Sequence, residues 1–275
     1  MQQGETVRPG RMTAKSRSRH CFYALLLVLA ASLCACRDSS RATSSRVTLT
    51  LSVAASLQNV IVDVESAYQR DHAEVDFRNN FGSSGTLARE IEEGAPVDAF
   101  ISAAPKPMDS LESKGLIVHA TRRNLLRNSL VLIAPRDSRL RDFQGLMDSS
   151  VRLIALGDPA SVPAGQYGRQ TLTALHLFDK LDSKLVLGRD VRQVLTYVET
   201  GNADAGIVYA TDAQASGRVR IVAVAPDSSH DAIVYPAAAI KTSLNEEAAR
   251  SFVEYLGSPA AQAIFVKHGF TIASP

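Results

Sequence analysis

The residues best suited to chemistry in this chain are small hydroxyl and glycine residues placed where helices are expected to begin. The stretch FGSSGT, residues 81–86, precedes a helical run and contains Ser84, and Ser56 lies in a second such stretch, AASL. The first N–H groups of a helix have no acceptor within it, and the helix dipole adds positive potential there. These loops can therefore bind an anion. The simpler alternative is that Ser56 and Ser84 are ordinary N-caps, a position that serine favours.

Three further loops carry polar groups of the same kind. They are DPASVPAGQYG (158–168), RDVR (189–192) and GIVYATDA (206–213). Pro163 has no N–H, which leaves Ala164 and Gly165 as expected free donors near a helix start. Val191 places its N–H at another expected helix start, and Tyr209 offers a hydroxyl at a strand end. Hydroxyls, N–H groups and helix dipoles with few charges form a shell suited to an anion.

Motifs of the common enzyme classes are missing from the sequence. A serine hydrolase needs a nucleophile, a base and an orienting acid, and the chain has serines, Asp158 and six histidines but no GxSxG motif. It also has no HExxH and no GxxxxGK[ST] motif. We therefore expect neither an enzyme nor a cofactor, and a secreted hydrolase that uses Ser84 remains the third alternative. The absence of Trp and the 6% aromatic content argue against a stacking surface for nucleic acid.

The N-terminus predicts export. A basic region, residues 1–20, precedes CFYALLLVLAASLCAC, an apolar segment that is too short to span a bilayer comfortably. LCAC resembles a bacterial lipobox, which implies cleavage before Cys36 and lipidation of its thiol; a plain secretory signal cut near Ala35 is the alternative. We expect a signal peptide over residues 1–35, whose start is Met1 or Met12, and a linker over 36–46. Either signal places the protein in the periplasm or cell envelope.

The mature chain has few features of a basic or thiol-dependent protein. The leader carries five Lys or Arg residues and one Glu, so its removal changes the formal net charge from +2 to −2. A basic partner-binding protein is therefore not indicated. All three cysteines, Cys21, Cys34 and Cys36, lie in the leader or at its boundary, which leaves none for a disulfide, a zinc site or thiol catalysis.

The pattern of apolar residues predicts an α/β fold. VTLTLSV (47–53) alternates as a strand does, and the following segment has apolar residues at helical spacing. Strands and helices alternate in this way to the C-terminus, where Asn245 is expected to cap a helix. We therefore predict an α/β class with mostly parallel sheets, and two lobes because about 230 residues exceed a typical single domain. Ligands of such sheets bind at the carboxyl ends of the strands, where the five loops lie.

Seven stretches of the chain resemble the periplasmic molybdate-binding proteins of ABC importers. In order, they are VAASL, FGSSGTLAREIEEGAPVDAFISA, RRNLLRNSLVLIAP, GDPASVPAGQYG, DVRQVL, GIVYATDA and AAQAIFVKHGF, and they extend over residues 47–273. The resemblance implies a periplasmic-binding-protein-like fold, with a ligand cleft between two lobes joined by two crossing strands. The first lobe would comprise residues 47–127 and 236–275, and the second would comprise residues 128–235.

The same resemblance implies the site and its partners. Ser56 and Ser84 would bind the oxyanion from the first lobe, and the backbone of Ala164 and Val191 with the hydroxyl of Tyr209 would bind it from the second. Gly85 stands where some members have another serine, which removes one possible hydroxyl. The implied protein is monomeric, binds no nucleic acid and delivers molybdate to the membrane subunits of an ABC permease, from a lipid anchor on Cys36.

Ligand chemistry narrows the choice of oxyanion but does not identify a single one. Molybdate is a tetrahedral dianion at neutral pH, and a shell of neutral donors disfavours phosphate that still carries a proton. Sulfate also only accepts hydrogen bonds, so a binding protein for sulfate or another tetrahedral oxyanion is the alternative. Tungstate has almost the size of molybdate and should bind comparably.

Overall fold

The computed structural model describes residues 46–273 together with Gly4 and Thr6. Apart from Gly4, Thr6 and Arg46, the expected signal peptide and the linker with Cys36 lie outside the described residues. In the described part, no helix has both the length and the apolar character that crossing a membrane requires.

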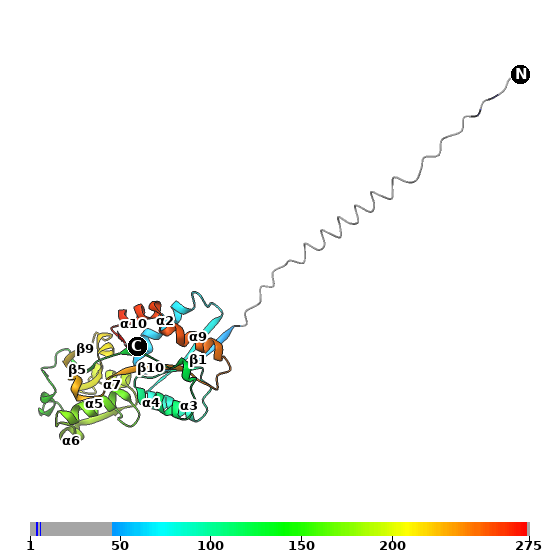
Figure 1. The fold of residues 1–275 in the computed structure, drawn as a ribbon. Helices are drawn as coiled ribbons and strands as arrows, with labels where there is room; N and C mark the ends of the chain where they lie inside the picture. The colour runs from blue at the N-terminus through cyan, green and yellow to red at the C-terminus, as the bar shows by residue number, and fades with distance from the viewer. Residues whose placement is uncertain (1–3, 5, 7–45, 274–275) are drawn as a thin grey trace. The chain divides into compact units, whose positions relative to one another are not determined.

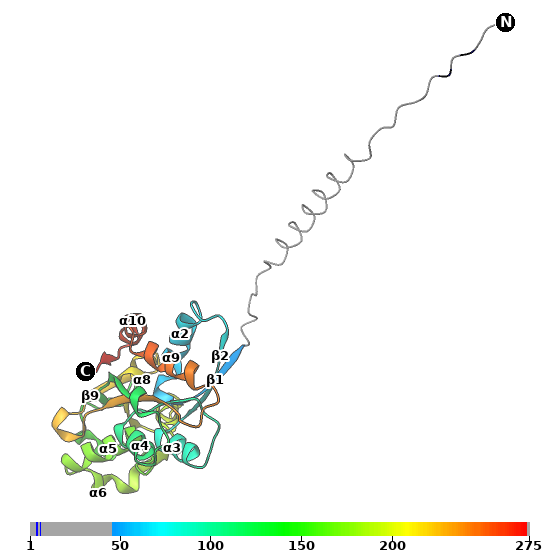
Figure 2. The same ribbon diagram turned by 45° about the vertical axis from the view of Figure 1, so that its right-hand side comes forward.

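A six-stranded sheet forms the centre of what we call the first lobe. Its strands run in the order β11 (Thr271–Ile272), β4 (Arg123–Arg127), β10 (Val234–Ala239), β3 (Ala99–Ile101), β1 (Val47–Ala54) and β2 (Val75–Gly82). Helices α2 (Gln58–Tyr68), α9 (Glu246–Leu256) and α10 (Pro259–Lys267) cover one face, and α3 (Ser84–Glu92) and α4 (Pro105–Ser113) cover the other (Figures 1 and 2). Leu49, Leu51 and Val53, alternate residues of β1, are fully buried, because every second side chain of a strand points to the same face of the sheet.

A five-stranded sheet forms the centre of the second lobe. Its strands run in the order β7 (Leu185–Gly188), β6 (Ile154–Gly157), β8 (Ala205–Tyr209), β5 (Leu130–Pro135) and β9 (Val219–Val224). Its helices are α5 (Pro163–Ala174), α6 (Phe178–Leu181), α7 (Val191–Glu199) and α8 (Ala210–Gln214). Glycines let α5 and α7 approach the sheet closely: a Cβ on Gly206 would lie 2.8 Å from Val198 of α7, and one on Gly168 of α5 would lie 2.5 Å from Leu156.

Short 3-10 segments complete the described structure. They are η1 (Ala55–Leu57), η2 (His119–Thr121), η3 (Gln144–Met147), η4 (Asp182–Lys184) and η5 (Asp227–Ser229). The chain passes between the sheets twice, from β4 to β5 and from β9 to β10.

The predicted α/β class is confirmed, but the expectation of mostly parallel sheets is wrong. β1 pairs with β2 and β3 in parallel, and β6 pairs with β7 and β8 in parallel, whereas β5 and β10 pair only antiparallel with their neighbours. Each of these two strands lies next to a passage between the sheets and enters its sheet in the opposite direction.

One local expectation also needs correction. Asn245 precedes α9 without a side-chain cap, because its amide donates to Thr48 O and to the Asp98 carboxylate instead. Tyr209 is the last residue of β8, as expected, and the polar ATDAQ that follows forms α8. β4 and β11, which were not predicted from the sequence, are short strands paired with each other near one edge of the first sheet.

Candidate functional site

A small cavity lies where the carboxyl ends of three parallel strands of the first sheet meet those of three parallel strands of the second. Its lining comes from Ala54–Ser56 after β1, Gly82–Ser84 after β2, Ala103 after β3, Val162–Ala164 after β6, Asp190 and Val191 after β7, and Tyr209 at the end of β8. The volume open to the centre of a water molecule is only about 10 Å³. This is about the room that one water requires. The loops of both lobes therefore line a space of about that size, at the place where α/β sheets bind ligands.

Ser84 is a buried hydroxyl of this cavity and not a helix cap. The N-cap of α3 is Ser83, whose Oγ accepts from Thr86 N at 3.3 Å, so the N-cap alternative is wrong for Ser84. Ser84 is the first residue of α3, is fully buried, and accepts a hydrogen bond from Ala103 N at 2.9 Å. Because this bond uses a lone pair of Oγ, the hydroxyl proton remains free to be donated.

Ser56 lies within η1 and does not cap a helix either. No side-chain oxygen caps η1 or α2. The Ser56 hydroxyl lies 3.1 Å from the hydroxyl of Tyr235, which also accepts from Asn128 Nδ2 at 3.3 Å. The same amide donates to Thr211 Oγ1 at 2.9 Å. Ser56 is therefore linked to a polar chain that runs from the first lobe through the passage between β4 and β5 into the second.

The second lobe contributes the beginnings of two helices. Ala164 is the second residue of α5 and Val191 is the first residue of α7, so neither N–H has an acceptor within its helix. Asp190 caps α7 by accepting from Gln193 N at 2.8 Å.

Gly165 is not the free donor that the sequence suggested. Its N–H donates to Val162 O at 2.9 Å. Its lack of a side chain matters for a different reason, because a Cβ there would lie 1.9 Å from Gly157 O. Glycine at this position lets the start of α5 pack directly against the end of β6.

Tyr209 provides the least satisfied polar group in the cavity. Its ring is 1% exposed, and among the described residues its hydroxyl has no hydrogen-bond partner. Burial raises the pKa of Tyr209 well above its ordinary value, and the nearby Tyr235, Tyr167 and Asp212 raise it further. The hydroxyl therefore stays protonated and can donate a hydrogen bond to a solute in the cavity.

The electrostatics of the cavity come from dipoles more than from side-chain charges. Its described lining contains no Lys or Arg, and its single acidic residue, Asp190, already caps a helix. Behind Tyr209 lies Asp212, which is 1% exposed and bonded to Arg192 Nη1 at 3.3 Å. Burial raises the pKa of Asp212 to about 7, and Arg192 partly opposes that rise. Helix N-termini and neutral hydroxyls are thus the donors available to an anion.

Gly85 connects the two lobes beside the cavity. Its N–H donates to Ser161 O, in the loop before α5, at 3.0 Å. A Cβ on Gly85 would lie 2.5 Å from that oxygen and 3.0 Å from Ser161 Cα. The position therefore does more than omit a hydroxyl, because only glycine allows this approach without a shift of the backbone.

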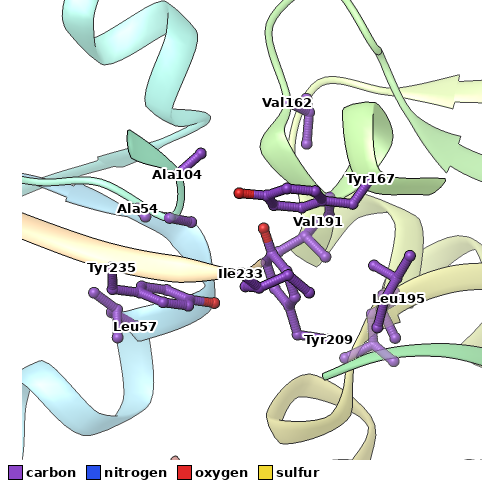
Figure 3. Close-up of a cluster of buried hydrophobic side chains, with 14 of the residues drawn as sticks. Ala54, Leu57, Ala104, Val162, Tyr167, Val191, Leu195, Tyr209, Ile233 and Tyr235 are labelled. Carbon is purple, nitrogen blue, oxygen red and sulfur yellow. The ribbon is translucent and has the colours of Figure 1, made fainter. Parts of the chain in front are cut away.

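The structure brings together all five residues that the sequence analysis selected, and it adds two tyrosines. In Figure 3, the hydroxyls of Tyr167, Tyr209 and Tyr235 all point into the space between the lobes. Tyr235 could have been noticed in IVYPAAAI, where its hydroxyl interrupts an otherwise apolar strand. Tyr167 could have been found from its spacing, because it lies about one helical turn after Ala164.

Comparison with known proteins agrees with this geometry. Residues 49–271 match the family model described as bacterial extracellular solute-binding protein. The chain is 44% identical over 250 residues to the "Putative ABC transporter substrate-binding lipoprotein YvgL" of Bacillus subtilis, covering 90% of this chain and 95% of that protein. It is 41% identical over 240 residues to the molybdate-binding protein ModA of Haemophilus influenzae, covering 84% of this chain and 92% of ModA.

A solved structure shows the same arrangement of lobes. The periplasmic molybdate-binding protein of Azotobacter vinelandii superposes with a TM-score of 0.74 at 26% identity, covering 82% of this chain and all of that one. The expected family and two-lobed fold are confirmed, and the chain belongs to the bacterial extracellular solute-binding proteins, among the relatives of the molybdate-binding proteins.

Proposed function

We propose that this protein captures molybdate in the cavity between its lobes and delivers it to an ABC-type membrane permease. The observation that carries the proposal is that three helix N-termini and the hydroxyls of Ser56, Ser84 and Tyr209 meet around one cavity whose described lining has no Lys or Arg. Such a shell spreads the charge of a dianion over many neutral donors. Tungstate is the expected second ligand, because it has almost the same size and charge.

The donors that we assign to the oxyanion are the hydroxyls of Ser56, Ser84 and Tyr209 and the backbone N–H groups of Ala164 and Val191. Ser84 and Tyr209 support the assignment best, since each has a buried hydroxyl whose proton is not committed to another group. Neither a catalytic residue nor a cofactor forms part of the proposal.

We further propose two lobes, residues 47–127 with 236–275 and residues 128–235, that close on the ion as a monomer. The strands of the first sheet come from 47–127 and 234–272, and those of the second come from 130–224, in support of this division. Closure follows if the ion makes more contacts in the closed state than in the open one. Anchoring through a lipid on Cys36 is part of the proposal, and the lipoprotein name of the relative from Bacillus subtilis supports it.

Calorimetric titration of the mature domain with molybdate, tungstate, sulfate and phosphate tests the function directly. We expect tight binding of molybdate and tungstate alone. A preference for sulfate would favour the alternative ligand, and no binding of any of the four would contradict the proposal. Hydrolysis of a general ester substrate that is lost in Ser84→Ala would instead favour the hydrolase alternative.

A further inference from the structure

Tyr167 lines a larger pocket beside the cavity, and it lies one turn of α5 after Ala164, which lines the cavity. We call the larger pocket the mouth pocket; it has a volume of about 520 Å³ and is lined by Ala104–Lys106 and Asp109 of the first lobe and by Tyr167, Arg169 and Gln170 of the second, among others. Neighbouring residues line the two spaces on both sides: Ala103 lines the cavity and Ala104 the mouth pocket, while Ala164 lines the cavity and Tyr167 the mouth pocket.

The Tyr167 ring crosses the gap between the lobes at this point. It projects from α5 in the second lobe, and Figure 3 shows its hydroxyl directed toward Ala54 and Ala104 of the first. The residue is 4% exposed although it lines an open pocket. Its ring therefore fills the gap and does not lie on the surface of the pocket.

The connection from β9 to β10 holds the ring from behind. The Tyr167 and His230 rings lie 5.8 Å apart, centroid to centroid, at an angle of 57°. The next residue, Asp231, is fixed to α5 by two hydrogen bonds with Gln170, of 2.7 and 2.9 Å. One residue before His230, the hydroxyl of Ser229 lies 3.1 Å from that of Thr171, also on α5. The support of the ring is thus part of a passage between the lobes.

We propose that Tyr167 is the gate of the oxyanion cavity, an inference that rests on the proposed function. With the lobes together, the ring closes the path from the cavity to the mouth pocket. When the lobes separate, the ring moves with α5, of which Tyr167 is part. The hydrogen bonds of Gln170 and Thr171 keep residues 229–231 against the same helix. The ion then leaves only when the lobes open. Tyr167 sets the rate of exchange and is not one of the donors that bind the ion.

The inference predicts a specific kinetic change in Tyr167→Ala. Loss of the ring opens a permanent path past Ala104, so we expect capture and release of molybdate to accelerate together, each at least tenfold. The dissociation constant should change less than threefold, because a gate alters the barrier and not the bound state. Tyr167→Phe keeps the ring and should exchange within about twofold of the wild-type rate.

The rate of molybdate release can be measured with a labelled ion, so that the assay does not depend on tyrosine fluorescence. The protein is loaded with radioactive molybdate and chased with excess unlabelled tungstate, and bound ion is separated by rapid gel filtration at successive times; equilibrium dialysis gives the dissociation constant. Tyr255→Ala is the matched control, since it removes a half-buried ring that packs 5.1 Å from Tyr68 and lines neither space.

The results show whether Tyr167 acts as a gate, contacts the ion directly or does neither. Unchanged rates in Tyr167→Ala would overturn the gate while wild-type binding leaves the proposed function intact. Faster release with unchanged capture, and so a proportionally weaker affinity, would make Tyr167 a contact of the ion and also overturn the gate. Failure of the wild-type chain to bind molybdate or tungstate would overturn both proposals. Should Tyr167→Ala fail to fold by circular dichroism, Tyr167→Leu, which shortens the side chain but keeps it apolar, carries the same test.

Discussion

The two halves of the cavity differ in how far their polar groups are satisfied before any ligand is bound. In the first lobe, Ser84 is held by Ala103 N and Ser56 by Tyr235. In the second lobe, Tyr209 Oη and Asp212 Oδ2 are buried without a hydrogen-bond partner among the described residues. A buried polar atom without a partner costs free energy. The first half is therefore fixed in advance, whereas in the second half an anion can supply the acceptor that the Tyr209 hydroxyl lacks.

The comparison predicts that Ser84→Ala has the largest effect, because it damages both binding and folding. The change removes a donor to the ion, and it also leaves the buried Ala103 N without its acceptor. We expect a loss of about 1–3 kcal/mol in binding free energy and a similar loss in the free energy of unfolding. Titration with molybdate measures the first quantity, and urea unfolding of the ligand-free protein measures the second.

Ser258→Ala is the matched control for that experiment, because Ser258 does not line the cavity. Ser258 caps α10 through Ala261 N, so its loss should lower stability by about 1 kcal/mol with little change in affinity. Equal loss of affinity in the two variants would contradict the distinct role of Ser84.

Tyr209→Phe should change the binding free energy without lowering the free energy of unfolding. The hydroxyl has no partner to lose, so the free energy of unfolding of the ligand-free protein should stay the same or rise. Binding of molybdate should weaken by about 1–3 kcal/mol, since one hydrogen bond to a charged group disappears. The same titration and urea experiments measure both, and a clear loss of stability would show that the second half of the site is satisfied before binding.

The sequence identified the loops that line the cavity better than it predicted the structure around them. The loops could be identified because glycine, proline and serine have defined roles at strand ends and helix starts. Ser56 and Ser84 were ambiguous between capping and binding, since the choice depends on whether Ser83 or Ser84 takes the N-cap position. That choice is settled by the contact between Ser84 and Ala103, which are 19 positions apart.

Contacts between distant segments account for what was missed. The antiparallel direction of β5 and β10 depends on how the chain passes between the sheets, and the apolar pattern of a strand carries no direction. The role of Gly85 depends on Ser161 in the other lobe. The place of Tyr167 against Ala104 is likewise a property of the assembled lobes.

Gly85→Ala tests whether the enclosed state of the cavity matters for affinity. The added Cβ would meet the backbone of Ser161 at 2.5 Å, so the two lobes must separate slightly or the loop must shift. We expect molybdate binding to weaken by about 1 kcal/mol, at the low end of the usual cost of overpacking. Stability of the ligand-free protein should change little, because open lobes avoid the contact. Gly94→Ala is not a suitable control, since Gly94 has a φ of +93°; Gly217→Ala, with open space at the Cβ position, is.

The smallest expected effect is a dependence of binding on pH that comes from Asp212. Burial raises the pKa of this carboxyl from 3.8 to about 7, against the opposing effect of Arg192 and with a further rise from Asp190. In the ligand-free protein the group therefore favours folding most below pH 4, and this contribution is lost as pH rises to about 7.

A dianion beside Tyr209 raises the pKa of Asp212 again, because like charges disfavour ionisation. Binding then takes up a proton, and the affinity for molybdate should fall severalfold between pH 6 and pH 8. Calorimetry in two buffers with different ionisation enthalpies measures the proton uptake at pH 7. In Asp212→Asn the uptake should vanish and the affinity should become flat across that range. An unchanged pH dependence in the variant would mean that another group responds to the ion and that Asp212 does not.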